Sequence, residues 1–163
     1  MSELEIIKVM ASRIDRRLFP FQIPRAFFYG WECDYWTLDA KGMTREFEIK
    51  ISRADYAIDA KKEKHKDYSK GANYFYYVCP KDLIKKEEVD SKYGLVYVDG
   101  NQMYFVKTPK KLHKNEFDQW KILANKMYWK WWNLWKDKFD SGQIGIDEYL
   151  SNQLLTFDEL TEH

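Results

Sequence analysis

The segment EFEIKIS, residues 46–52, alternates charged and apolar side chains in a run typical of a β-strand. Its charged residues are Glu46, Glu48 and Lys50. Successive side chains of a strand point to opposite faces, so we expect one apolar face and one face with two carboxylates and an ammonium. A solvated surface strand has this pattern, and so does a strand that holds a metal ion. The pattern alone leaves both interpretations open.

A second charged strand is predicted directly before this one. WECDYWTL, residues 31–38, has strand composition, and DAKG, residues 39–42, has turn chemistry. If the two strands pair as a hairpin, Asp34 lies near Glu48 and Lys50. Two carboxylates about 4 Å apart repel by roughly 4 kcal/mol at an effective dielectric of about 20, so a cation should accompany them. We expect Asp34 and Glu48, with the backbone carbonyl of Ile49, to hold Mg²⁺ or Mn²⁺, because Mg²⁺ prefers oxygen ligands.

Two carboxylates, a divalent ion and a lysine suit the hydrolysis of phosphodiester bonds. The ion would lower the pKa of a coordinated water and neutralise charge that develops on the phosphate oxygens. The Lys50 ammonium, on the same strand face as Glu48, would orient the water or stabilise the anion. Asp34, Glu48 and Lys50 are therefore the predicted catalytic residues.

The same residues resemble a known motif. Asp34, followed after a turn by Glu48-Ile49-Lys50, resembles the D…(D/E)xK motif of the PD-(D/E)XK nuclease superfamily, although Cys33 stands where the superfamily name has proline. EIKISRADY, residues 48–56, is similar to the EIKxSRADF stretch of the MmcB-like DNA-repair group. The resemblance covers residues 31–80. It implies a metal-dependent DNA nuclease of DNA repair or mobile-DNA processing, with a restriction-endonuclease-like mixed central sheet flanked by helices.

The remaining pattern also predicts an α/β fold. Residues 2–18 indicate a helix opened by a capping box of Ser2 and Glu5. Its expected apolar stripe is Leu4, Ile7, Ala11, Ile14 and Leu18. Pro20 and Pro24 predict a loop. NYFYYVCP, residues 73–80, indicates a buried strand, and residues 93–108 a hairpin that turns at Asp99-Gly100.

A lysine-rich helix is predicted directly after the charged strand, over residues 53–68 with Ser52 as its N-cap. Beside a metal site its basic run KKEKHK would contact the phosphate backbone of DNA, whereas alone it would be a solvated face. The candidate nucleic-acid-binding residues are Arg53, Lys61, Lys62, Lys64, His65 and Lys66.

The C-terminal part of the chain predicts a tryptophan-rich helix over residues 115–139. Its stripe is Trp120, Leu123, Met127, Trp131, Leu134 and Trp135, which we expect to pack on the sheet. Trp129 and Trp132 lie off the stripe and are candidates for a homodimer contact, for a contact with the tail or for stacking on unpaired bases. We expect a single nuclease-like domain over residues 1–139 and an acidic tail, with a short helix, over 140–163.

The charge distribution is uneven. The net charge is +1, but residues 140–163 hold six acids and no lysine or arginine, so the first 139 residues carry 27 bases against 20 acids, a surplus of +7. A basic body suggests a polyanion such as DNA as partner, although a solubility-balanced surface has the same composition. The two cysteines and three histidines lack zinc-site spacing. No signal peptide and no apolar run of roughly 18 residues is present, so we expect a cytoplasmic protein without a membrane partner.

Two alternatives to a nuclease remain open from the sequence. The first is a nuclease-like fold that binds DNA without cutting it. The second is a structural or interaction protein that uses the tryptophan-rich helix as its partner surface.

The basic run generates a first testable prediction. If Lys61 to Lys66 contact phosphates, DNA affinity should fall by roughly 100-fold between about 50 and 200 mM salt, because each neutralised phosphate releases counterions. Fluorescence anisotropy with a labelled duplex measures this dependence. A flat response would remove the phosphate-binding role from this run.

Overall fold

The structure is a computed structural model of the 163-residue chain. It describes residues 1–39, 41–59, 61–62 and 71–114, together with isolated positions between 123 and 141. The chain divides into two compact units, Met1–Phe117 and Asp118–His163, and the account below concerns the first. The tryptophan-rich helix and the boundary between residues 139 and 140 lie outside the described residues, apart from those isolated positions.

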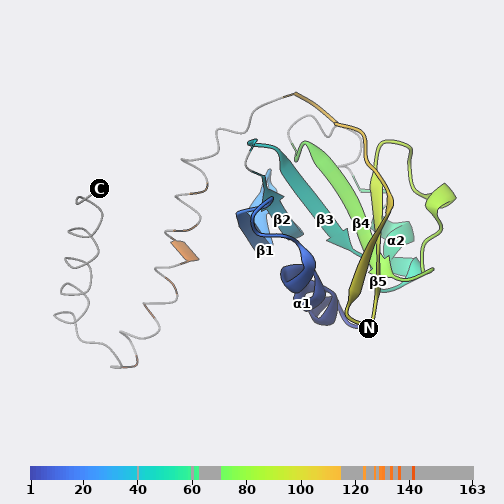
Figure 1. Ribbon diagram of the computed structural model, residues 1–163, viewed down its shortest axis with the longest axis horizontal. Helices are drawn as coiled ribbons and strands as arrows, with labels where there is room; N and C mark the ends of the chain where they lie inside the picture. Colours follow the sequence, from blue (N-terminus) through green and yellow to red (C-terminus); the bar gives the residue numbers. More distant parts are fainter. Residues whose placement is uncertain are drawn as a thin grey trace. The chain divides into compact units, whose positions relative to one another are not determined.

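Within the described residues, the first unit is built on one six-stranded mixed sheet in the order β1-β2-β3-β4-β5-β6 (Figure 1). The strands are β1 (Phe21–Phe28), β2 (Trp31–Leu38), β3 (Thr44–Ile49), β4 (Tyr74–Pro80), β5 (Gly94–Asp99) and β6 (Gln102–Lys107). Strands β1, β2 and β3 are antiparallel, β3, β4 and β5 are parallel, and β6 returns antiparallel to β5. The predicted α/β class with a mixed central sheet is confirmed.

The helices described in this unit lie on opposite faces of the sheet. They are α1 (Glu3–Arg13), α2 (Arg53–Asp59) and the 3-10 turn η2 (Lys86–Glu88). Apolar residues of α1 form one core with Tyr35, Phe47 and Val78, whereas Tyr56 of α2 packs against a second core that contains Tyr77. No helix in this part of the chain has the length and apolar composition of a membrane span.

Helix α1 begins as predicted, ends earlier than predicted, at Arg13, and buries only part of the predicted stripe. Ser2 Oγ accepts from the Glu5 backbone N–H, and the Glu5 carboxylate accepts from the Ser2 backbone, so the capping box is confirmed. The predicted stripe is confirmed at Ile7 and Ile14, which are buried, and is wrong at its ends, because Leu4 is 57% exposed and Leu18 lies beyond the helix and is 61% exposed. The buried positions are Ile6, Ile7, Val9 and Met10. Several apolar rows run along this helix, and contact with the sheet selects the one that is buried.

The expected loop at Pro20–Pro24 is also wrong, because Pro24 lies within β1. Strand β1 is the edge of the sheet and pairs on one side, with β2. Proline is tolerated in an edge strand, since its missing N–H need not contribute to a second ladder. The strand then turns into β2 through Tyr29 and Gly30, which both have positive φ, at 60° and 95°.

The predicted DAKG turn sets the register of the site. The Asp39 carboxylate accepts from the backbone N–H groups of Lys41 and Met43, each at 2.9 Å, and Gly42 has a φ of 78°. This turn pairs Leu38 with Thr44 and Tyr35 with Phe47. Continued by one residue, the register places Asp34 opposite Glu48.

Helix α2 is shorter than predicted. The Asp55 backbone N–H donates to Ser52 Oγ at 3.1 Å, which confirms the N-cap. The helix ends at Asp59, and the N–H groups of Lys61 and Lys62 close a turn onto Ile58 and Asp59. The expected continuation to Tyr68 is therefore wrong at these residues, and residues 63–70 lie outside the described part.

Packing at Gly94 generates a second prediction. A Cβ at this position would lie 2.3 Å from Tyr76 Cδ1 and 3.0 Å from the Lys107 carbonyl oxygen. The Tyr76 ring cannot retreat easily, because it stacks on Phe47 and is buried. Gly94→Ala should therefore lower the free energy of unfolding by roughly 1 to 3 kcal/mol in urea denaturation.

A matched control lies on the turn between β5 and β6. Gly100 has a φ of 55° with nothing within 4 Å of its virtual Cβ, and asparagine tolerates that backbone region. Gly100→Asn should change stability by less than about 0.5 kcal/mol. Equal effects of the two substitutions would contradict the tight packing at Gly94.

Candidate active site between β2, β3 and α2

The charged face of β3 is buried rather than solvated. Glu46 and Glu48 are 0% and 4% exposed, and Lys50, directly after the strand, is 3% exposed. This face points toward α2, because Glu48 pairs in register with Tyr77, whose hydroxyl donates to Asp59 of α2. Burial of ionised groups is costly unless each group has a partner, so the solvated-strand interpretation is wrong for these three residues.

Asp34 contacts the end of β3 directly. Its Oδ2 accepts from the Ile49 backbone N–H at 2.7 Å. Burial raises the pKa of the Asp34 carboxyl to about 7, and the neighbouring Glu48 carboxylate adds to the shift. The bond from Ile49 and the charge of Lys50 act in the opposite direction. The structure thus brings Asp34 to the end of β3, where the hairpin register places it.

Lys50 forms an ion pair with Glu48. Its Nζ lies 2.8 Å from Glu48 Oε1, and its backbone N–H donates to the Val78 carbonyl at 2.8 Å, so both ends of the residue are held. Burial alone would lower the pKa of Lys50. The carboxylates of Glu48, Asp59 and Asp55 outweigh that effect and raise the pKa, which keeps Lys50 a cation at neutral pH.

Asp59 completes a charged cluster with Asp34, Glu48 and Lys50, and it was missed by sequence reasoning. It is fully buried, with Oδ1 2.6 Å from Lys62 Nζ and 3.4 Å from Lys50 Nζ. Its Oδ2 accepts from the Tyr77 hydroxyl at 3.0 Å. Burial and the Asp59 charge raise the Tyr77 pKa, so the phenol stays a donor.

A helical spacing in the sequence carries a signal for Asp59. Asp55 and Asp59 are four residues apart and share one helix face directly after the EIK motif. Asp55 Oδ1 also lies 3.5 Å from Lys50 Nζ. The spacing gave no indication that this face would turn toward the sheet.

The predicted nucleic-acid-binding residues that the structure describes, Arg53, Lys61 and Lys62, differ in their contacts. The Arg53 guanidinium pairs with the Glu88 carboxylate and donates to the Leu83 carbonyl at 3.0 Å. The Lys62 ammonium turns to the cluster, whereas Lys61 is exposed. Lys64, His65 and Lys66 lie outside the described residues.

The predicted ligand set fits Mg²⁺ in its chemistry. Asp34 and Glu48 supply carboxylate oxygens, and the Ile49 carbonyl leaves the extended backbone on the same side as the N–H that bonds Asp34. Among the described residues, no group of three or more histidine, cysteine, aspartate or glutamate side chains is arranged to hold a metal. Mg²⁺ keeps several waters and uses one or two carboxylates, so it does not need such a group.

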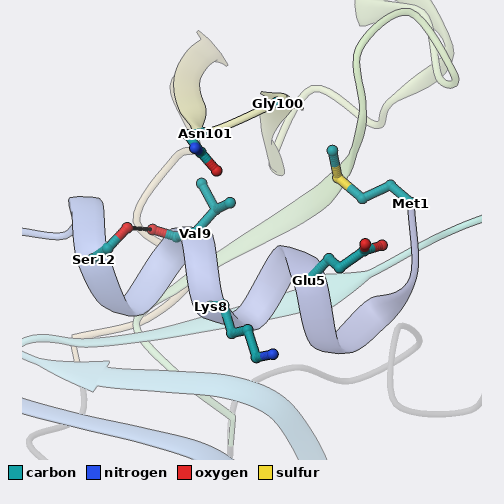
Figure 2. Close-up of a pocket in the computed structure, with 7 residues that line it drawn as sticks. All are labelled: Met1, Glu5, Lys8, Val9, Ser12, Gly100 and Asn101. Atoms are coloured by element: carbon teal, nitrogen blue, oxygen red, sulfur yellow. Dashed lines mark hydrogen bonds between the residues drawn. The ribbon is translucent and has the colours of Figure 1, made fainter.

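A surface hollow lies away from this cluster, between α1 and the turn from β5 to β6 (Figure 2). It has a volume of about 500 Å³ and is lined by Met1, Glu5, Lys8, Val9, Ser12, Gly100 and Asn101. Two of its polar side chains have local partners, since Ser12 Oγ donates to the Val9 carbonyl and the Glu5 carboxylate accepts from Ser2. We therefore place the candidate site at the charged cluster and not at the hollow.

Comparison with known proteins establishes the fold. No protein-family model and no curated protein matches the chain. The solved structure of the SPO1766 protein of unknown function from Silicibacter pomeroyi superposes with a TM-score of 0.65 at 19% identity. The match covers 90% of this chain and 97% of that chain. At this identity the likeness extends to the fold alone, so the chemistry rests on the residues described above.

The environment of Asp34 generates a third prediction. With a folded-state pKa of about 7 against an ordinary value of 3.8, the folded chain binds a proton that the unfolded chain has released between these pH values. Stability from this group is therefore present at pH 4 and is lost as the pH rises to 7. Asp34→Asn removes that loss. The free energy of unfolding of the variant minus that of wild type should therefore be roughly 2 to 4 kcal/mol higher at pH 8 than at pH 4.

Urea denaturation with a chelator present measures this difference. Glu32→Gln is the matched control, because Glu32 is an exposed acid on the same strand. Its effect should be the same at both pH values. An Asp34→Asn effect that is equally independent of pH would show that the Asp34 carboxyl is not perturbed.

Proposed function

We propose that this chain is a metal-dependent DNA nuclease that hydrolyses phosphodiester bonds, with a restriction-endonuclease-like fold of the PD-(D/E)XK type. The observation that carries the proposal is the convergence of Asp34, Glu48 and Lys50. All three meet at the end of β3. The Ile49 backbone N–H donates to Asp34 at 2.7 Å, and the Lys50 ammonium lies 2.8 Å from the Glu48 carboxylate.

Each of these residues has a defined role in the proposed reaction. Asp34 and Glu48, with the Ile49 carbonyl, would hold Mg²⁺ or Mn²⁺. When bound, the ion supplies Lewis-acid chemistry, which favours a hydroxide nucleophile and neutralises charge on the phosphate. Lys50 keeps its charge in the buried site and is held by Glu48, so its ammonium is preorganised to orient the attacking water or stabilise the phosphate oxygens.

The order of elements supports the same proposal. Helix α1 is followed by strands β1 to β3, then by helix α2 and strand β4, so the β2–β3 hairpin that carries the candidate residues lies between two helices. The two candidate carboxylates come from adjacent strands and the lysine from the end of the second. The resemblance also implies a role in DNA repair or in the processing of mobile DNA, and this role is part of the proposal.

DNA as substrate is supported by the charge of the body. The surplus of +7 over the first 139 residues favours a polyanion, and Lys61 is exposed near the cluster on the turn after α2. With a divalent ion on Asp34 and Glu48, the charged cluster would be suited to bind the phosphodiester group of DNA.

A nuclease-like fold that binds DNA without cutting is a second candidate. It is favoured by the pairing of both nearby ammoniums, Lys50 and Lys62, with carboxylates, because paired ammoniums are less available to a phosphate. It predicts DNA affinity without cleavage at any divalent ion concentration.

A cleavage assay separates the two candidates and is the fourth prediction. The full chain should cut DNA in Mg²⁺ or Mn²⁺ and not in a chelator. Asp34→Asn and Lys50→Met should each lower the rate by about 100-fold or more, because each removes a group that stabilises developing charge. Glu32→Gln should cleave like wild type.

Circular dichroism confirms that each variant is folded before its rate is compared. Cleavage that persists in both Asp34→Asn and Lys50→Met would move the active site elsewhere. DNA binding without cleavage in the wild-type chain would favour the inactive fold.

A further inference from the structure

Lys62 occupies a position between two buried carboxylates. Its Nζ lies 2.6 Å from Asp59 Oδ1 and 3.5 Å from Glu48 Oε1. The same two oxygens are contacted by Lys50 Nζ, at 3.4 and 2.8 Å. Glu48 and Asp59 thus share two ammoniums, and Lys62 is the one of the two that joins the cluster from outside the sheet.

The two lysines differ in how firmly they are held. The Lys50 side chain is 4% exposed, whereas the Lys62 side chain is 47% exposed and extends from the turn after α2. Moving a buried ammonium away from its partners leaves charges unpaired in a low-dielectric site. A half-exposed lysine can carry its charge into water on its flexible stem at much smaller cost.

We propose that Lys62 is a tethered cation that neutralises Glu48 and Asp59 when no divalent ion is bound, and that it yields its place at Glu48 when the ion binds. The inference rests on the proposed function, because the ion is the one assigned there to Asp34 and Glu48. A divalent ion on Glu48 repels an ammonium 3.5 Å from the same oxygen, so the two cations compete. The displaced ammonium remains beside the site, where a phosphate of the substrate can accept its hydrogen bonds.

The competition predicts an unusual effect of a neutral variant on ion binding. Lys62→Met keeps the length of the apolar stem and removes the charge, so the full chain should bind Mn²⁺ roughly two- to fivefold more tightly, the range of a partly exposed ion pair. Isothermal titration calorimetry without DNA measures this affinity. Without ion, the variant should have a lower melting temperature than wild type, because Asp59 and Glu48 lose a partner.

Two further variants control for charge and for position. Lys62→Arg keeps the positive charge and should bind Mn²⁺ like wild type. Lys61→Met removes the same charge from the neighbouring exposed residue, whose ammonium forms no ion pair within the described part of the chain. It should leave Mn²⁺ affinity unchanged. This control separates direct competition for Glu48 from a general change in the electrostatic potential at the site.

The outcomes distinguish this inference from the function beneath it. Equal Mn²⁺ affinity of wild type and Lys62→Met, with the melting temperature lowered, would make Lys62 a purely structural partner and overturn the inference alone. Absence of Mn²⁺ binding in all four proteins would overturn both the inference and the proposed function.

A measurement on the unmodified chain keeps the test independent of variant folding. Mg²⁺ titration of the wild-type chain, followed by NMR of the lysine ammonium groups, should shift the Lys62 signal, which is assigned by its absence from the spectrum of Lys62→Arg. An unmoved Lys62 signal at an ion concentration that saturates the site would overturn the inference.

Discussion

The buried ion pairs around Glu48 are the constraint on which this region of the structure depends. A carboxylate at 4% exposure is stable only with cationic partners or hydrogen-bond donors, and Glu48 has the Lys50 ammonium at 2.8 Å. Lys50 is equally buried, so it needs Glu48 and the α2 carboxylates in turn. Removing one member would leave the others with fewer partners in a buried site, so these charged residues stabilise the fold as a group.

The position of β3 inside the sheet keeps these charged side chains from reaching solvent. Strand β3 has β2 on one side and β4 on the other, and the α1 core lies against its apolar face. On its charged face, Glu46 accepts from Trp31 Nε1, and Lys50 after the strand contacts Asp55 and Asp59 of α2. The same arrangement positions Asp34, since the Ile49 N–H at the end of β3 is the donor that its carboxylate meets. Position and chemistry are thus set by one local geometry.

Much of this local geometry could be predicted from the sequence. The alternation in residues 46–51, the Asp39 turn and the Ser2 capping box are all short-range patterns whose physical cause lies within a few residues. The hairpin register that brings Asp34 to Glu48 follows from the turn. Two of the predictions that were wrong, at the α1 stripe and at Pro24, depend on neighbours distant in sequence, whereas α2 ends in a local turn at Lys61 and Lys62. An edge position admits Pro24, and contact with the sheet selects the buried row of α1.

The sequence by itself determined the candidate carboxylates, the lysine and the strand hairpin that joins them, because turn chemistry and side-chain alternation act over a few bonds. Only the tertiary structure decided that the charged face is buried, that Asp59 and Lys62 close the cluster, and that Tyr77 supports Asp59. Those contacts join β3, α2 and β4, and they exist because the parallel pairing of β3 with β4 places Tyr77 beside Glu48. A periodic pattern indicates which face of an element is distinct, whereas the neighbour that covers that face is chosen by the packing of the whole sheet.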